Sequence, residues 1–504
     1  MVDQSVEERV FKTRAGFIKH RYVICMLVFT GLALVYAMRV NLGVAIISMA
    51  RSSADANKTS LNGVCSSGIS PKNGTPVVQP EFDWDSSQRD FLLGAFFYGY
   101  ISTQIPGGIM AAKLSIKWVF GYGVFLTSLL TIATHFVARW SLTGFVVLRI
   151  LEGITEGVTF PSLYCLVARW APESERTTMT TLCVIGTNIG TVITMPITAA
   201  LASSSLGWPS SFYLPGAAGV LWSLVWYICA TSQPENHRWI SDEEREYIIK
   251  NRGTSHNRSR KIPWLSILTS RPVWMFAIAR MIGSITFYMF LTEMPSFVDE
   301  IFGVPAIDNG VLNGFFYVLY ATSSFGSGIL SDYLIRRNFM SRSNVRKLFE
   351  CSSFVSSGAM LLIVTQLGCS YTAVAVVLCF ACSFVALNGG GDAGLALDLA
   401  PELAGSVMGF GNMVGNVGAI IATQLVSISR NPENAHAGWN LAFIITALAS
   451  FFGAILFAFL GTAEEQPWAK EESDEVHFVD EAAEEEISNM SIPKRYSIQY
   501  ATIQ

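Results

Sequence analysis

The sequence predicts an all-α membrane protein with twelve transmembrane helices arranged as two six-helix halves. The first observation behind this prediction is composition, because 51% of the 504 residues are hydrophobic and only 14% are charged, against about 25% charged in soluble proteins. The second is a series of apolar runs of about 20 residues, the length that an α-helix needs to cross the hydrocarbon of a bilayer. The third is an internal repeat that relates the two halves.

Twelve apolar runs are predicted to be the transmembrane helices. They lie near residues 22–50, 91–112, 116–137, 142–168, 179–203, 211–231, 273–298, 311–331, 348–367, 371–397, 406–427 and 438–462.

The remaining segments divide the chain into regions. We expect an N-terminal tail (1–21), a first half (22–231) with a long outside loop (51–90), a central loop (232–272), a second half (273–462) and an acidic, disordered tail (463–504).

The distribution of Lys and Arg predicts that both termini are cytoplasmic. The loops 232–272 and 332–347 contain eight and five basic residues, and the N-terminal tail contains five, whereas the six connections on the opposite side contain six in total. Short loops rich in Lys and Arg stay in the cytoplasm. The N-x-S/T acceptors at Asn57 and Asn73 then fall outside, where glycosylation is possible.

The repeat consists of "APESERTTMTTLCVIG" at 171–186 and "APELAGSVMGFGNMVG" at 400–415. Both segments lead into the fifth predicted helix of a half, and the basic central loop separates the halves. Two parallel six-helix repeats around a midplane site are the layout of the major facilitator transporters.

The fourth predicted helix contains the densest charge pattern. Arg149, Glu152 and Glu156 are spaced i, i+3 and i+7, so they share one helix face, while Gly153 and Gly157 allow a neighbouring helix to approach. Ionisable groups within a membrane helix usually mark substrate or proton pathways, which favours proton coupling through the two glutamates. A structural ion pair between helices is the alternative.

Arg39 is a lone arginine in the first apolar run, "LVYAMRVNLGVAI" (34–46). One interpretation is a cavity residue that binds a carboxylate or phosphate with its planar guanidinium. The other is an arginine that extends to the membrane surface near the outer end of a long helix.

Several motifs identify the chain as resembling one transporter family. "GILSDYLIRR" (328–337) is similar to the G-x-x-x-D-x-x-x-R-R turn of the major facilitator superfamily, and "RILEGITEG" (149–157) to its helix-four motif. Further segments, including "YAMRVNLGVAI" (36–46), "GAFFYGYISTQIPGG" (94–108) and "TFYMFLTEMPSF" (286–297), resemble the organic-anion and phosphate group that contains sialin, the vesicular glutamate transporters and the sodium-phosphate cotransporters.

The resemblance implies secondary active transport of small organic anions such as acidic sugars or acidic amino acids, by alternating access and with proton-coupled symport. It implies that Arg39 and Arg149 bind substrate, that Glu152 and Glu156 couple protons, and that Asp332 with Arg336 and Arg337 forms a cytoplasmic latch. Tyr98 and Tyr100 are further candidate substrate contacts. Sodium coupling, potential-driven glutamate transport and a non-transporting sensor on the same fold remain alternatives.

Departures from the family favour a sialin-like carrier over a dedicated glutamate transporter. Leu93 and Gly283 replace the histidine and the helix-seven arginine of the vesicular glutamate transporters, although Arg280 lies one turn from Gly283. The family also implies a lysosomal or vesicular membrane, with the plasma membrane second. Tyr500 and Ile503 fit a tyrosine-based sorting signal that an adaptor would bind.

Other classes of protein are disfavoured. The sequence contains no Ser/His/Asp constellation, phosphate loop or metal-ligand spacing, and no basic face for nucleic acid. We therefore expect no enzyme activity, no cofactor or metal, and a proton or sodium as the only coupling ion, with a monomer as the working unit. Cys65 and Cys369 both fall in predicted outside loops and could form a disulfide.

Overall fold

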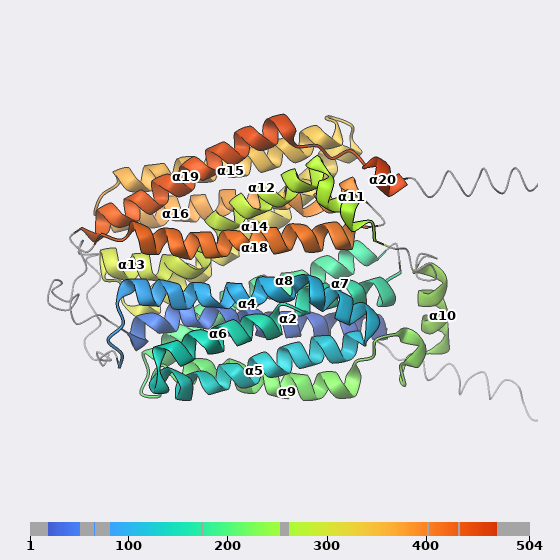
Figure 1. Cartoon of the computed structure of the whole chain (residues 1–504), viewed down its shortest axis with the longest axis horizontal. Coiled ribbons are helices and arrows are strands. Elements are labelled where there is room, and N and C mark those ends of the chain that lie inside the picture. Colours follow the sequence, from blue (N-terminus) through green and yellow to red (C-terminus); the bar gives the residue numbers. More distant parts are fainter. Residues whose placement is uncertain are drawn as a thin grey trace, which may run out of the picture.

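A computed structural model of the chain describes residues 19–50, 65, 81–172, 175–252, 262–400, 403–431 and 434–470. Apart from one isolated bridge between Ala50 and Phe82, the regular structure of these residues is helical. The long helices run side by side in two bundles, one built from each half of the chain (Figure 1).

The first bundle contains α2 (His20–Met49), α4 (Ser86–Lys113), α5 (Ile116–Trp140), α6 (Leu142–Glu156) continued by α7 (Thr159–Trp170), α8 (Arg176–Ala202) and α9 (Ser210–Cys229). The second contains α12 (Arg271–Tyr288) continued by the π-helical η3 (Met289–Glu293) and α13 (Met294–Phe302), α14 (Ala306–Arg336), α15 (Arg342–Gln366), α16 (Tyr371–Val385) continued by η4 (Ala386–Gly390), η5 (Asp392–Gly394) and α17 (Leu395–Leu399), α18 (Ala404–Ser429) and α19 (Ala435–Leu460). Each bundle thus contributes six membrane-crossing units, which confirms the predicted fold.

Nine helical segments of the described residues are long and apolar enough to span a bilayer by length and composition alone. The other three units are α4, the interrupted pair α6 and α7, and α14. Polar and charged side chains buried between helices lower the hydropathy of α4 and α14; Asp90, Gln104, Asn309 and Asn313 are examples. Such a helix is identified as a membrane-crossing unit by its place between other apolar segments, because its own hydropathy is too low.

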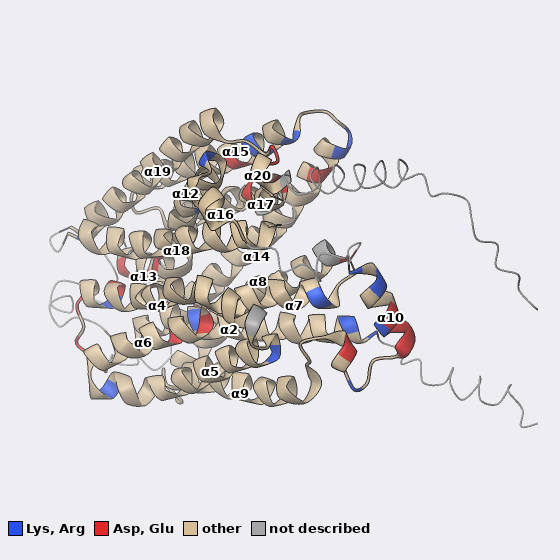
Figure 2. Ribbon diagram, turned by 45° about the vertical axis from the view of Figure 1, so that its right-hand side comes forward, with Lys and Arg blue, Asp and Glu red and all other residues tan. Residues whose placement is uncertain are grey.

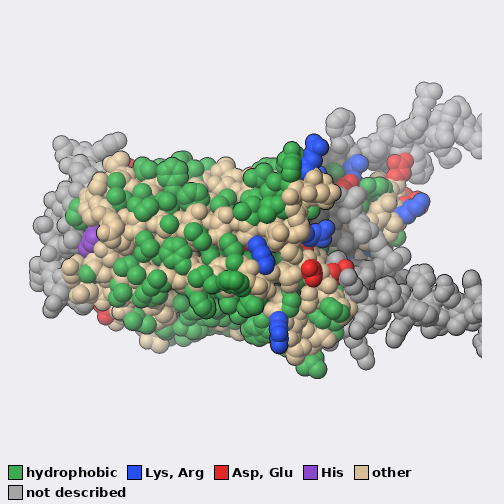
Figure 3. Space-filling model, turned by 90° about the horizontal axis from the view of Figure 1, so that it is seen from above, with side chains coloured by type: hydrophobic (Ala, Val, Ile, Leu, Met, Phe, Trp, Pro, Cys, Tyr) green, Lys and Arg blue, Asp and Glu red, His purple; other side chains and the backbone are tan. Residues whose placement is uncertain are grey.

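The bundles have two ends, which we name by their residues (Figures 1 and 2). The disulfide face contains the Cys65–Cys369 disulfide and the α13–α14 connection. The basic face contains the first residues of α2, the short helices α10 (Asp242–Asn251), α11 (Trp264–Thr269) and α20 (Pro467–Lys470), and most of the visible Lys and Arg. Between them the visible flank is covered largely by hydrophobic side chains, as a lipid-facing surface requires (Figure 3).

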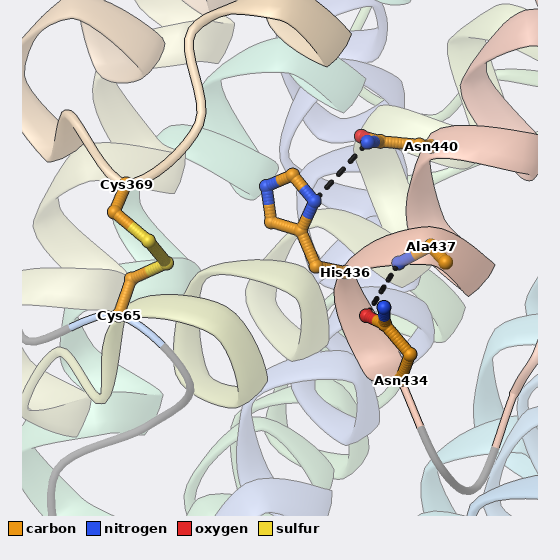
Figure 4. The surroundings of a disulfide bond; sticks show 6 residues. All are labelled: Cys65, Cys369, Asn434, His436, Ala437 and Asn440. Atoms are coloured by element: carbon orange, nitrogen blue, oxygen red, sulfur yellow. Dashed lines mark hydrogen bonds between the residues drawn. A yellow bond between two sulfur atoms is a disulfide. The ribbon is translucent and has the colours of Figure 1, made fainter.

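The disulfide joins the two halves of the chain. Cys65 follows α2 in the first half, and Cys369 lies between α15 and α16 in the second, with a Cα–Cα distance of 5.1 Å (Figure 4). The backbone N–H of Cys65 also donates to the carbonyl of Ile301 at the end of α13. The pairing that the two loop cysteines made possible is therefore present.

Part of the central loop folds onto the first bundle. Ser241 caps α10 by accepting a hydrogen bond from the N–H of Glu244. The guanidinium of Arg21 in α2 lies 3.3 Å from the Glu244 carboxylate, and Ile248 is fully buried against the bundle. The start of this loop is thus an ordered element of the basic face.

Glycines in the fourth membrane-crossing unit allow close packing, as predicted. A Cβ on Gly153 would lie 2.0 Å from the carbonyl oxygen of Phe96 in α4, and one on Gly157 would lie 2.2 Å from Oγ1 of Thr103. The helix also breaks after Glu156, between α6 and α7. The close contact with α4 and this break together fix the position of Glu152 and Glu156 within the first bundle.

The two bundles meet along α8 against α14 and α4 against α18. Several of the predicted positions lie outside the described residues: the glycosylation acceptors Asn57 and Asn73, the sorting residues Tyr500 and Ile503, and the acidic tail beyond residue 470.

Candidate substrate and proton site

Four of the predicted site residues form one buried group between α2 and α6. Arg39, Arg149, Glu152 and Glu156 are each at most 6% exposed. Nε of Arg39 donates to Oε1 of Glu156 at 2.7 Å, and Nη1 of Arg149 donates to Oε2 of Glu152 at 2.5 Å. Two guanidinium groups and two carboxylates therefore neutralise one another in pairs, which burial in a low-dielectric interior requires. We call these four residues the α2–α6 cluster.

Arg39 points into the bundle and not toward the membrane surface. Its guanidinium carbon lies 4.5 Å from the ring centroids of Tyr36 and Tyr100 and 4.8 Å from that of Phe96. Such cation–π contacts hold a cation where water is excluded. Nη1 of Arg39 and Oε2 of Glu156 have no hydrogen-bond partner among the described residues. The pair therefore retains one guanidinium nitrogen and one carboxylate oxygen that could bind other partners.

A cavity of about 710 Å³ lies between the bundles beside this cluster. Tyr36 and Tyr100, which cover Arg39, form part of its wall. At its other end it is lined by Ile262, Trp264 and Leu403, which lie at the basic face. The structure thus has its cavity on the basic side, with the α2–α6 cluster behind two tyrosines.

The structure separates the two candidate tyrosines. Tyr100 is 1% exposed and lines the cavity, together with Gln104 one turn on. Tyr98 is 43% exposed on the outer surface of α4, packs against Phe91 and is absent from the cavity wall. Residues two apart on a helix point about 200° apart, so the prediction that Tyr98 contacts substrate is corrected by this placement.

The disulfide face is closed by ion pairs between the bundles that the sequence analysis missed. Arg430 at the end of α18 donates to Asp90 of α4 at 2.7 Å and to Glu300 of α13 at 2.6 Å. Arg89 of α4 lies 3.2 Å from Glu300 as well. We call these four residues the disulfide-face gate. The one signal in the sequence is that all four charged residues lie near the ends of predicted helices.

The predicted latch is not formed in this conformation. Asp332, Arg336 and Arg337 are all exposed at the basic face, and no ion pair joins them within the part of the chain that the structure describes. The Arg337 guanidinium lies over the ring of Tyr333 instead. The unpaired latch residues at the basic face and the ion pairs at the disulfide face indicate a conformation that is open on the basic side and closed on the disulfide side.

A two-bundle helical membrane protein with a cavity at the bundle interface and buried paired charges beside it has the architecture of a secondary transporter of the alternating-access class. The particular family follows from comparison with known proteins. The profile described as "Major Facilitator Superfamily" matches residues 28–423. Human sialin is 32% identical over 459 residues, covering 89% of this chain and 90% of sialin.

A second relative is vesicular glutamate transporter 3 of Danio rerio, which is 34% identical over 462 residues, covering 90% of this chain and 75% of that protein. The chain belongs to the major facilitator superfamily and, within it, to the group of sialin and the vesicular glutamate transporters.

Two solved structures share the fold at low sequence identity. A bacterial homolog of the human lysosomal transporter Spinster, in an inward-facing and occupied conformation, gives a TM-score of 0.63 at 14% identity and covers 88% of this chain and 97% of its own. A D-xylose-proton symporter gives 0.62 at 12% identity, covering 88% and 99%.

Proposed function

We propose that this chain is a proton-coupled symporter of small organic anions, with an acidic sugar or another carboxylate of similar size as substrate. The observation that carries this proposal is the Arg39–Glu156 pair. Arg39 is a cation suited to a carboxylate, yet in this conformation a carboxylate of the protein already occupies it. The names of the relatives, sialin and the vesicular glutamate transporters, support an anionic substrate.

The pair supports coupling by exchange. When a proton neutralises Glu156, Arg39 becomes free to bind the carboxylate of the substrate, so anion and proton are held together. When both leave through the basic side, Glu156 takes Arg39 again. Because each exchange leaves the buried charge balanced, the empty and the loaded forms can both change conformation, whereas an unbalanced buried charge would be costly.

Arg149 and Glu152 have a supporting role in this proposal. The guanidinium of Arg149 reaches Glu152 and the backbone carbonyl of Arg39, and Thr131 donates to the other oxygen of Glu152 at 3.3 Å. The second pair therefore fixes the position of α2 relative to α6 and is available as a further proton acceptor.

Orientation and compartment are part of the proposal. A disulfide persists in an oxidising compartment, which supports a disulfide face turned away from the cytosol and cytoplasmic termini. The Arg139 guanidinium, which donates a hydrogen bond to Glu81 on that face, lowers the pKa of the Glu81 carboxyl and so favours its ionised form. We propose a lysosomal or vesicular membrane, with the plasma membrane second, and a monomer whose tail binds a sorting adaptor.

The experiment is uptake into proteoliposomes of the purified protein. Labelled sialic acid, glucuronate, aspartate, glutamate and phosphate are offered under a proton gradient, a sodium gradient and a membrane potential in turn. We expect sialic acid or glucuronate to accumulate under the proton gradient. Uptake driven only by sodium, or of glutamate driven only by potential, would replace the proposal by one of those mechanisms. No uptake under any condition, by protein that is shown to be folded, would favour a sensor.

A further inference from the structure

The wall of the cavity contains one charged pair, contributed by the second bundle. Nη1 of Arg280 in α12 donates to Oδ2 of Asp392 in η5 at 3.0 Å. Among the described residues, these two are the only charged side chains that line the cavity. The α2–α6 cluster lies behind tyrosines, so a solute in the cavity meets Arg280 directly. We call Arg280, Asp392 and Glu350 the second-bundle cluster.

A break in the tenth membrane-crossing unit brings these residues together. The glycines 389–391 let this segment lie against α14 and α15: a Cβ on Gly391 would lie 2.4 Å from Oε2 of Glu350, and one on Gly390 would lie 2.8 Å from the carbonyl oxygen of Ser327. The N–H of Asp392 then donates to Oε2 of Glu350 at 3.2 Å. A side chain at Gly390 would force the backbone of α14 to move, so glycine at this position allows the approach that places two acidic residues next to one arginine.

The charges in this cluster do not balance. Glu350 is 1% exposed and has no ion pair among the described residues. The charged and titratable groups that face the two carboxylates are Arg280 from α12 and Arg346 from α15, with Tyr320 from α14 nearby.

Arg346 is already committed elsewhere, since it donates to Asp398 at 2.8 Å. Two ionised carboxylates that share one guanidinium repel each other, so an ionised Glu350 makes it easier for Asp392 to take up a proton.

The Arg280–Asp392 pair differs from a purely structural pair in the same region. Arg346 is tied down on several sides, because its Nη1 also donates to Ser331 and to the carbonyl of Gly390, and it does not line the cavity. Arg280 makes a single hydrogen bond to Asp392, its side chain is 24% exposed, and its other N–H groups have no partner within the described part of the chain. It therefore presents free donors to the cavity.

We propose that the second-bundle cluster is a second anion-binding station, at which a carboxylate ligand replaces Asp392 on Arg280 while Asp392 takes up a proton. The proton comes from the water of the cavity and forms an O–H bond with a carboxylate oxygen of Asp392. One negative charge and one positive charge are thus added together, and the net charge of the cluster is unchanged. Glu350 makes this step possible, because its negative charge raises the free energy of the ionised form of Asp392 beside it. The inference rests on the proposed function, because it assigns a further station to the same anion.

The test is equilibrium binding of labelled sialic acid and glucuronate to the purified full-length protein at pH 5.5 and pH 7.5. Asp392→Asn removes the internal competitor for Arg280, so we expect binding at pH 7.5 to strengthen roughly tenfold, and the ratio between the two pH values to shrink. The matched control is Glu81→Gln, which removes a carboxylate from another arginine–carboxylate pair, on the disulfide face and away from the cavity, and it should leave both affinities unchanged.

A second variant protects the test against a folding defect in Asp392→Asn. Glu350→Gln retains the Arg280–Asp392 pair but removes the neighbouring negative charge, so the pH of half-maximal binding should move to lower values. Binding by Asp392→Asn that equals or falls below that of the wild type, or an unchanged pH profile in Glu350→Gln, would overturn the second station. If the wild type binds neither probe and transports none of the five anions, the proposed function itself fails. The second station alone is overturned if the wild type binds a probe, Arg39→Ala abolishes that binding, and Asp392→Asn and Glu350→Gln have no effect on it.

Discussion

At the scale of single residues, the structure places the isolated Arg39 in a buried ion pair. Arg39 alone in an apolar run left two interpretations open. The pairing with Glu156, under the rings of Tyr36 and Tyr100, is incompatible with an arginine extended to the membrane surface. Its role as the anion partner stays a prediction, which two substitutions test.

Arg39→Ala should abolish anion uptake. Removing one member of a buried ion pair leaves the other charge uncompensated, which costs about 3–5 kcal/mol. Arg39→Lys is the sharper variant, since it retains the charge but loses the planar fork that holds a carboxylate through two hydrogen bonds. We expect at least a tenfold loss of uptake in Arg39→Lys, on the order of 1.4 kcal/mol, with normal thermal stability. Uptake by Arg39→Lys at the wild-type rate would contradict bidentate binding at this site.

Glu156→Gln should separate anion transport from the proton. An amide cannot compete for Arg39 as an ion, so anion exchange between the two sides of the membrane should continue while accumulation driven by a pH gradient is lost. The measurement is uptake with and without the gradient, and the control is Glu81→Gln, which removes another carboxylate paired with an arginine, on the disulfide face and away from the cavity. Gradient-driven accumulation by Glu156→Gln would remove this residue from the coupling step.

At the scale of helices and connections, the sequence predicts where charged residues lie along a helix better than it predicts their ion-pair partners. The spacing of Arg149, Glu152 and Glu156 and the glycines beside them predicted a charged, closely packed face, and α6 has it. Glu350 and the gate residues escaped prediction because each lies near the end of a predicted helix, among charges that look solvated. Their partners come from helices distant in sequence, and no local pattern specifies those contacts.

The disulfide-face gate is an element that must open during transport. Asp90→Asn removes one carboxylate from Arg430 and should shift the protein toward conformations open on that side. The reporter is Leu93→Cys, a buried position one turn further along α4, labelled by an impermeant maleimide applied to the disulfide face. Loss of part of a buried ion-pair network is expected to increase the labelling rate on the order of tenfold.

The control for the gate is Glu81→Gln in the same Leu93→Cys background, because Glu81 pairs with Arg139 within the first bundle. An equal increase in both variants would mean that the face loosens generally. No increase in Asp90→Asn would show that the ion pairs do not hold this side closed.

At the scale of the whole molecule, composition, the apolar runs and the internal repeat were sufficient to predict twelve helices in two bundles. The conformation was not predictable, because the open basic side and the closed disulfide side depend on contacts between α4, α13 and α18 that form only in the folded protein. The latch residues Asp332, Arg336 and Arg337 illustrate this point. The motif predicts a latch of these three residues, but whether they pair depends on the conformation, and in this one all three are exposed.

The orientation of the molecule is tested by its glycosylation. With the disulfide face outside the cytosol, Asn57 or Asn73 should carry a glycan, and treatment with a glycosidase should increase the electrophoretic mobility of the wild type. The double variant Asn57→Gln, Asn73→Gln should show no such shift. A shift that persists in the double variant would place the glycan elsewhere and remove this support for the orientation.

In the proposed cycle, the carboxylate of Glu156 leaves Arg39 when it takes up a proton, and the carboxylate of the substrate takes its place. The most direct measurement is proton movement driven by the anion alone, in proteoliposomes that contain a pH-sensitive dye and have no initial pH gradient, with the membrane potential clamped. We predict that an inward gradient of the transported anion acidifies the interior of wild-type vesicles and leaves the pH of Glu156→Gln vesicles unchanged. Anion entry into wild-type vesicles without acidification would contradict the exchange.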